Sequence, residues 1–277
     1  LDWLTAIEQR TGLHADLGLL TQAPSVALLA RRLSAPAESG PALALALGPA
    51  PGAAPTLYIA ASGHGDRLRF ERLAEALAPQ VRVQMLQPPP GLAVQGIAEL
   101  AARYGRHIEA QRGAGAPVWL AGFSVGGVTA LETARWLQTQ GVAVSELLLI
   151  DSVYPRWLFR RPSLWRLLGW LTRSLTVQEL SMNGRRLGAM FKDAALVGQV
   201  LALHRHRIQA YDGPVRLLRS SGLARWQGLC FGPWRKRLRL QEEEVEGLHG
   251  SVFEPGRVHG LAQCLRRALR LEAPARP

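Results

Sequence analysis

Cysteine and lysine are scarce in this chain of 277 residues. The two cysteines, Cys230 and Cys264, are too few for a disulfide framework and lack the spacing of metal ligands. We therefore expect two free thiols, no metal site and a reducing, cytoplasmic location. Lysine occurs only at Lys192 and Lys236, so the formal net charge of +12 comes almost entirely from arginine.

Long apolar runs and a concentrated basic face are also missing. No uncharged apolar run reaches the roughly 18 residues that a membrane-spanning helix needs, so we expect no stable membrane insertion. The arginines are dispersed along the chain, whereas a nucleic-acid-binding protein gathers them on one face, so we expect no nucleic acid partner. The densest clusters, 156–166 and 234–239, alternate arginine with Trp and Leu. That pattern is typical of amphipathic packing, with an acidic partner surface or an interfacial helix as the alternative.

The length allows one sizeable domain with a small appendage. The chain begins without Met or a signal-like segment, so we expect it to be a piece of a longer protein. Residues 1–33 have helical patterns of their own, and residues 34–41 have the small, proline-rich composition of a linker. From residue 42 onward, β and α patterns alternate.

This alternation predicts an α/β fold with a mostly parallel sheet and helices on both faces. Several expected strands are short, continuous apolar runs, as in strands covered on both sides. Expected strands begin near residues 42, 55, 81, 117, 146, 214 and 238, and expected helices cover 66–77, 97–111, 124–138 and 255–271.

The alternation is interrupted at residues 154–211, where the pattern is helical and no strand is expected. A helical insertion at the sheet end where ligands bind is typical of a lid. Its apolar side chains, among them Trp157, Trp165 and Trp170, would then contribute to substrate specificity. The alternative is that many of them only pack the lid against the core.

The motif Gly122-Phe123-Ser124-Val125-Gly126 lies between an expected buried strand and an expected helix. This is the G-x-S-x-G arrangement that exposes a serine hydroxyl on a sharp turn and points a helix N-terminus at a developing anion. We interpret Ser124 as a nucleophile. The alternative is a serine that only caps the following helix.

A nucleophilic serine needs a base, and the base needs an orienting carboxylate, in the chain order Ser, acid, His for this fold. Asp151 directly follows the next expected strand, although a strand-end Asp can also simply bond the next turn. His249 lies in a glycine-flanked loop between the last expected strand and helix. His64 is the alternative base, but we interpret it as a substrate or structural contact.

The tetrahedral intermediate needs two N–H donors for its oxyanion. Val125, directly after the nucleophile, supplies one backbone N–H. The other is expected from the loop at residues 61–65, and Gly63 is our candidate.

Together these residues resemble the terminal thioesterase domains of non-ribosomal peptide and polyketide synthases. The likeness runs through VWLAGFSVGGVTALETARWLQTQG, ELLLIDSVYP and VEGLHGSVFEPGRVHGLAQCL, and it covers nearly the whole chain. It implies an α/β-hydrolase fold, with Ser124, Asp151 and His249 as the triad. The chain departs from the family at Ala61-Ser62, where members usually have His-Pro.

The resemblance also implies a carrier. Residues 1–33 resemble the C-terminal part of an acyl or peptidyl carrier domain, 34–41 a linker, and 42–277 the thioesterase. The domain itself would need no cofactor, because the acyl or peptidyl thioester arrives on the phosphopantetheine of the upstream carrier. Release would be by hydrolysis or macrocyclisation. A free-standing carboxylester hydrolase or editing thioesterase, and a catalytically silent binding module, are the alternatives.

Overall fold

In the computed structural model the chain divides into two units, residues 1–42 and 43–277, and each is described by itself. The structure describes residues 25, 27, 43–49, 54–62, 67–88, 96–113, 115–152, 202–203, 206–222 and 230–271. The predicted carrier part at 1–33, apart from two residues, the linker at 34–41 and most of the predicted lid at 154–211 therefore lie outside the described residues.

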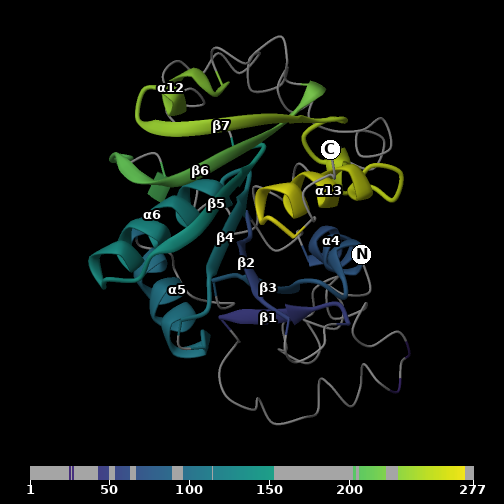
Figure 1. Cartoon of the computed structure of the whole chain (residues 1–277), viewed down its shortest axis with the longest axis horizontal. Coiled ribbons are helices and arrows are strands. Elements are labelled where there is room, and N and C mark those ends of the chain that lie inside the picture. The colour runs from purple at the N-terminus through teal and green to yellow at the C-terminus, as the bar shows by residue number, and fades with distance from the viewer. Residues whose placement is uncertain are drawn as a thin grey trace, which may run out of the picture. The chain divides into compact units, whose positions relative to one another are not determined.

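A seven-stranded sheet in the order β1-β3-β2-β4-β5-β6-β7 forms the centre of the second unit (Figure 1). Only β1, at one edge, runs antiparallel to its neighbour; every other pair is parallel. The strands are β1 (Ala44–Leu47), β2 (Thr56–Ala60), β3 (Arg82–Leu86), β4 (Val118–Phe123), β5 (Val144–Ile150), β6 (Tyr211–Ser220) and β7 (Leu238–Val245). All the expected strands are present, and the predicted fold class is confirmed.

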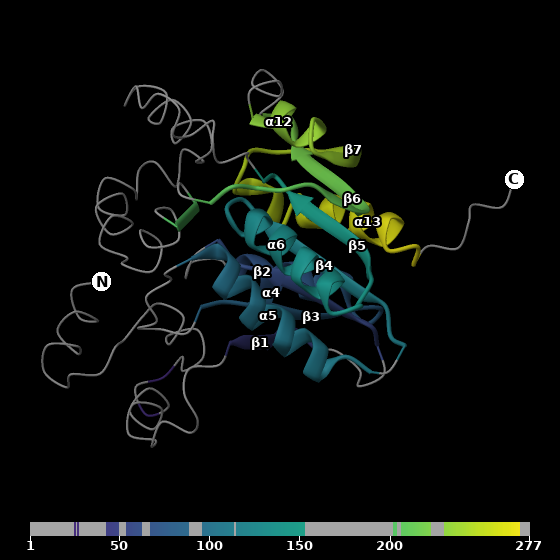
Figure 2. The ribbon, with the colours of Figure 1, turned by 90° about the vertical axis from the view of Figure 1, so that its left-hand side faces the viewer.

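Helices cover both faces of this sheet, as Figures 1 and 2 show. One face carries α5 (Ile97–Gln111) and α6 (Gly126–Thr139), and the other carries α4 (Arg67–Leu77) and α13 (Val258–Ala268). The short elements α12 (Gly232–Arg235) and η3 (Ser251–Phe253) complete the described helices. Helix α12 was not expected as a separate element.

The core is divided by the sheet into two layers. Tyr58 and Ala60 of β2 point into the layer under α5 and α6, while Leu57 and Ile59 point into the layer under α4 and α13. This alternation follows from the two-residue period of a strand, and it explains why β2 is apolar throughout. The apolar residues of α5 form one stripe that is buried in the first layer.

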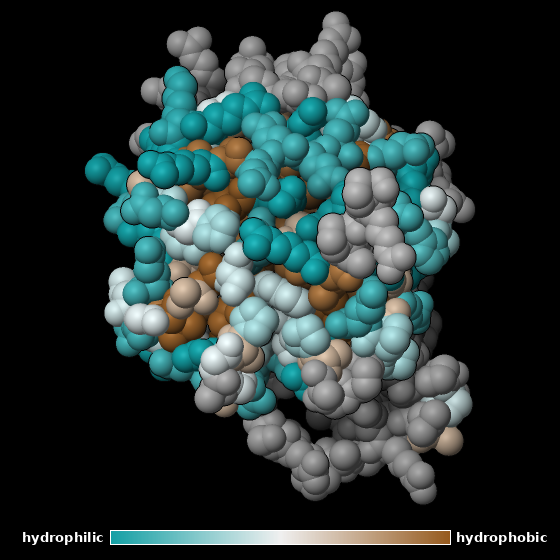
Figure 3. Space-filling model, in the orientation of Figure 1, coloured by the Kyte–Doolittle hydropathy of each residue, from teal (hydrophilic) through white to brown (hydrophobic). Residues whose placement is uncertain are grey.

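Hydrophilic residues cover much of the face seen in Figure 3, with smaller hydrophobic areas between them. On β7, the consecutive residues Glu242, Glu243 and Glu244 pair with arginines of β6, α12 and α13. Part of the arginine excess is therefore paired within the fold. Among the described helices, none combines the length and apolar character required to cross a bilayer.

Candidate active site

Ser124 and Asp151 lie at the same edge of the sheet because each directly follows one of two neighbouring parallel strands, β4 and β5. Both have a left-handed backbone, with φ of 51° and 46°. Such values are uncommon for residues other than glycine and store local strain, often at functional sites. The N–H of Ser124 donates to the carbonyl of Ile150 at 3.0 Å, which ties the two turns together.

Glycines around Ser124 are required by close backbone approach. A Cβ on Gly122 would lie 2.4 Å from the carbonyl oxygen of Gly126, and one on Gly126 would lie 2.2 Å from that of Ala60. On Gly127, a Cβ would lie 1.9 Å from the hydroxyl oxygen of Ser152. No side chain fits in these places, so the turn from β4 into α6 depends on these three glycines.

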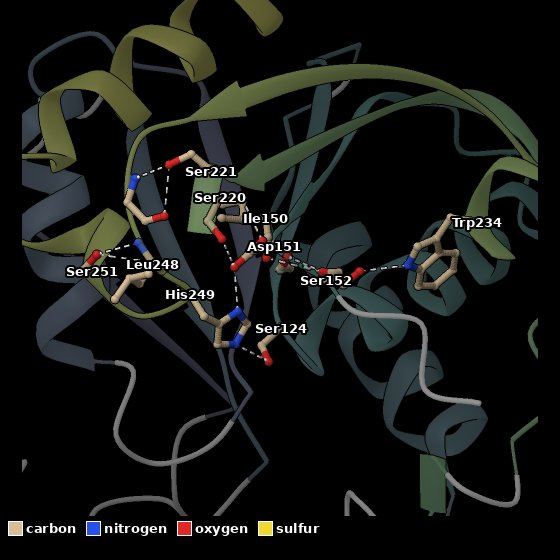
Figure 4. Close-up of polar contacts among 12 residues, drawn as sticks. Ser124, Ile150, Asp151, Ser152, Ser220, Ser221, Trp234, Leu248, His249 and Ser251 are labelled. Atoms are coloured by element: carbon tan, nitrogen blue, oxygen red, sulfur yellow. Dashed lines mark hydrogen bonds and ion pairs between the residues drawn. The ribbon is translucent and has the colours of Figure 1, made fainter. Parts of the chain in front are cut away.

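Three side chains form a continuous hydrogen-bonded chain at this edge (Figure 4). His249 Nε2 lies 2.9 Å from the Oγ of Ser124, and His249 Nδ1 lies 2.7 Å from Oδ2 of Asp151. Asp151 is fully buried, while Ser124 and His249 are 7% and 8% exposed. A serine, an imidazole and a buried carboxylate in this order have the geometry of a nucleophile, its base and the group that orients the base.

Strand β6 holds the carboxylate. The main-chain N–H of Asp151 donates to the carbonyl of Leu218 at 2.6 Å. Ser220 then donates its N–H to Oδ1 at 2.9 Å and its hydroxyl to Oδ2 at 2.8 Å. With His249, these donors satisfy both oxygens of a carboxylate that has no contact with water.

The loop that carries His249 is anchored by two serines. The N–H of Gly247 donates to the hydroxyl of Ser221 at 3.1 Å, and the N–H of Leu248 donates to the hydroxyl of Ser251 at 2.8 Å. Gly247 has a φ of 132°, a conformation open to glycine and rarely adopted by other residues. The loop therefore presents the imidazole from a fixed backbone (Figure 4).

Ser152, the residue that follows Asp151, is also held in place by hydrogen bonds. The indole Nε1 of Trp234, in α12, donates to the carbonyl of Ser152 at 2.8 Å, and the hydroxyl of Ser152 donates to the carbonyl of Gly122 at 3.2 Å. The turns after β4 and β5 are thus joined a second time. Residues 206–210, the described segment just before β6, are also held in place, because Arg135 of α6 donates to the carbonyl of Ala210.

The structure brings Ser124, Asp151 and His249 together and places Val125 beside them. Val125 is the N-cap residue of helix α6, and the hydroxyl of Ser124 faces His249, a contact that the simple-cap alternative for Ser124 does not explain. No carbonyl of the described residues accepts the N–H of Val125. Gly63 and His64 lie outside the described residues, so the role of Gly63 stays a prediction.

Sequence reasoning missed Ser220, Ser152 and Trp234. Ser220 could have been suspected, because Ser220-Ser221 end a strand at the edge where the other site residues gather. Trp234 offered no comparable sequence signal, since its contact with Ser152 crosses 82 positions of the chain.

Metal-ligand clusters and reactive thiols are not found in the described part of the chain. No group of three or more His, Cys, Asp or Glu side chains there could hold a metal ion. Both cysteines are buried. Burial raises the pKa of the Cys230 thiol to about 12, helped by the charge of Asp151, and burial raises that of Cys264 to about 11.

Residues 55–218 match the family described as "Thioesterase domain". This chain belongs to the thioesterase domain family. A curated relative, the non-reducing polyketide synthase aoiG of Aspergillus oryzae, is 32% identical over 155 residues, which are 54% of this thioesterase chain and 7% of the synthase. The chain therefore spans a small part of that relative's length.

Solved structures agree with this membership. The NocB thioesterase domain, crystallised as a covalent complex with a fluorophosphonate nocardicin G analog, is 27% identical with a TM-score of 0.63. That alignment covers 82% of this thioesterase and 99% of NocB. A four-domain nonribosomal peptide synthetase, holo-AB3403 bound to AMP and glycine, is 19% identical with a TM-score of 0.68, covering 95% of this chain and 23% of the synthetase. The second likeness shows the fold alone.

Proposed function

We propose that this thioesterase releases an acyl or peptidyl chain from a phosphopantetheine carrier through an acyl-enzyme on Ser124. The observation that carries the proposal is the unbroken chain of hydrogen bonds from the Ser124 hydroxyl through His249 to the buried Asp151, at 2.9 and 2.7 Å. The similarity to a polyketide synthase and to a solved thioesterase domain supports a carrier-bound thioester as the substrate.

The first half of the reaction forms an ester. The Oγ of Ser124 attacks the thioester carbonyl carbon while Nε2 of His249 takes the hydroxyl proton. Asp151 orients the imidazole through Nδ1 and stabilises the charge that the ring then carries. When the C–S bond breaks, the proton on Nε2 passes to the departing pantetheine sulfur, and the acyl group remains on Ser124.

The second half releases the product. His249 removes a proton from water, or from a hydroxyl or amine of the bound chain, as that group attacks the ester. When the ester C–O bond breaks, this proton passes from Nε2 to the Oγ of Ser124. Water gives the free acid, and an internal nucleophile gives a ring. The N–H of Val125 would donate to the oxyanion in both halves, and each such donor lowers the barrier by about 3 kcal/mol. Gly63 is proposed as the second donor.

We also propose that residues 1–33 are the C-terminal part of a carrier domain, joined by the linker 34–41 to the thioesterase. The sequence of residues 1–33 supports this proposal, because TGLHADLGLLTQAPSVALLARRL resembles the last helices of a carrier domain. A free-standing carboxylester hydrolase or editing thioesterase would use the same triad without this carrier part, and a silent binding module would form no acyl-enzyme.

Intact mass spectrometry after incubation with a synthetic acyl pantetheine thioester tests the acyl-enzyme. We expect a mass increase of one acyl group in the wild type and none in Ser124→Ala. The matched control is Ser145→Ala, because Ser145 is exposed on β5 at the strand end opposite Asp151. An equal adduct yield in wild type and Ser124→Ala would remove Ser124 from the mechanism, and the released product distinguishes a free acid from a ring.

A further inference from the structure

Ser220 occupies a position that the triad alone does not explain. It ends β6, the strand that pairs in parallel with β5, and it lies beside Asp151, which continues β5 by donating its N–H to Leu218. Both side chains are buried, with Ser220 1% and Asp151 0% exposed. Two residues that are 69 positions apart are thus packed together without water.

Ser220 contacts both oxygens of the carboxylate. Its N–H donates to Oδ1 at 2.9 Å and its hydroxyl donates to Oδ2 at 2.8 Å. Oδ2 is also the oxygen that faces Nδ1 of His249 (Figure 4). Because one residue holds both oxygens, it fixes the rotation of the carboxylate plane, and with it the direction in which Oδ2 meets the imidazole.

The hydroxyl of Ser220 is not needed to keep β6 in place. Residues 215–218 of the strand pair with β5 on one side, and residues 215–220 pair with β7 on the other, where Ser220 pairs with Val245. Replacing the hydroxyl by hydrogen would therefore leave the backbone N–H bond to Oδ1 and remove only the bond to Oδ2. The carboxylate could then turn about its Cβ–Cγ bond.

We propose that Ser220 is a positioning residue for catalysis, which acts through Asp151 to hold the base His249 toward Ser124. This inference rests on the proposed function, since it presumes that the three residues work as a triad. Ser220 itself touches neither substrate nor the reacting atoms.

The test measures how fast Ser124 is phosphonylated by a simple alkyl fluorophosphonate. In this reaction Oγ attacks phosphorus, fluoride leaves, and the hydroxyl proton passes to His249, so the rate reports on serine activation without a natural substrate. The variants are Ser220→Ala, Asp151→Ala and the double variant, made in the full chain. Thermal unfolding of each variant verifies that it is folded.

We expect Ser220→Ala to slow labelling by roughly 10- to 100-fold, the effect of one charge-assisted hydrogen bond. In the Asp151→Ala background the same change should slow it by less than about twofold, because the residue through which Ser220 acts is gone. A loss of the same size in both backgrounds, or no loss in the first, would overturn the proposal.

Failure of the proposed function would look different. If peptide mapping placed the phosphonyl group on a residue other than Ser124, the triad itself would be wrong. Labelling of Ser124 at the wild-type rate in Ser220→Ala would overturn only the positioning role.

Discussion

The ring of Phe123 stacks on the imidazole of His249, with centroids 4.8 Å apart and planes inclined by 27°. Phe123 is the residue before Ser124, and its ring also packs on that of Phe253 in a T-shaped arrangement, with centroids 5.0 Å apart. The strand that carries the proposed nucleophile thus also supports the face of the proposed base.

Replacing Phe123 by leucine should lower kcat/KM for a thioester by roughly 3- to 10-fold, because an aromatic pair of this kind contributes about 0.5–1.5 kcal/mol. Steady-state kinetics measures the loss. The matched control is Phe70→Leu, since Phe70 packs on Phe253 at 5.6 Å on the same side of the sheet. Both variants should unfold more easily, and an equal kinetic loss in the control would contradict a specific role of the Phe123 ring.

Gly126→Ala should destabilise the fold by more than about 2 kcal/mol, because the new Cβ would lie 2.2 Å from a backbone oxygen that cannot move aside. Urea unfolding monitored by tryptophan fluorescence measures the change. Gly260→Ala is the control: Gly260 lies inside α13 and has nothing within 4 Å of the added Cβ. It should stabilise the protein by up to about 1 kcal/mol. Similar stability of both variants would argue against the tight turn.

The two thiols should resist alkylation in the native protein. With a pKa of about 11, Cys264 is a thiolate in about one part per thousand at pH 8, and Cys230, with a pKa of about 12, is less ionised still. Intact mass spectrometry after iodoacetamide treatment should show no adduct at pH 8 and two adducts in urea. Rapid modification of the native protein would contradict the buried positions of both residues.

Glu242 should make stability depend on acid pH. Arg235 donates to both of its carboxylate oxygens at 2.5 and 2.7 Å, and this lowers the pKa of Glu242. A carboxylate whose pKa is lower in the folded state stabilises the protein fully above its unfolded value of about 4.3, and this contribution is lost as the pH falls through the folded value.

Glu242→Gln should therefore be less stable than wild type at pH 7 by under about 1 kcal/mol, since the pair is partly exposed, and the difference should shrink at pH 3.5. Urea unfolding at the two pH values measures it. A difference that is the same at both pH values would show that the ion pair is not its cause.

Sequence alone determined the α/β class, the positions of the strands and the order of the serine, acid and histidine. These features follow from local patterns: apolar runs mark strands, a glycine-flanked serine marks the turn into α6, and the residue after a parallel strand lies at the sheet edge where ligands bind. Asp151 and His249 could be chosen because each follows a strand of that sheet.

Tertiary structure alone decided how these residues are held. The bonds of Ser220 to Asp151, of Trp234 to Ser152 and of His249 to Ser124 join positions 69, 82 and 125 apart. No local pattern encodes them, because each depends on the register between strands and on which side chains the packed core turns toward each other. The strained turns at Ser124 and Asp151 are likewise stable only because neighbouring strands hold them.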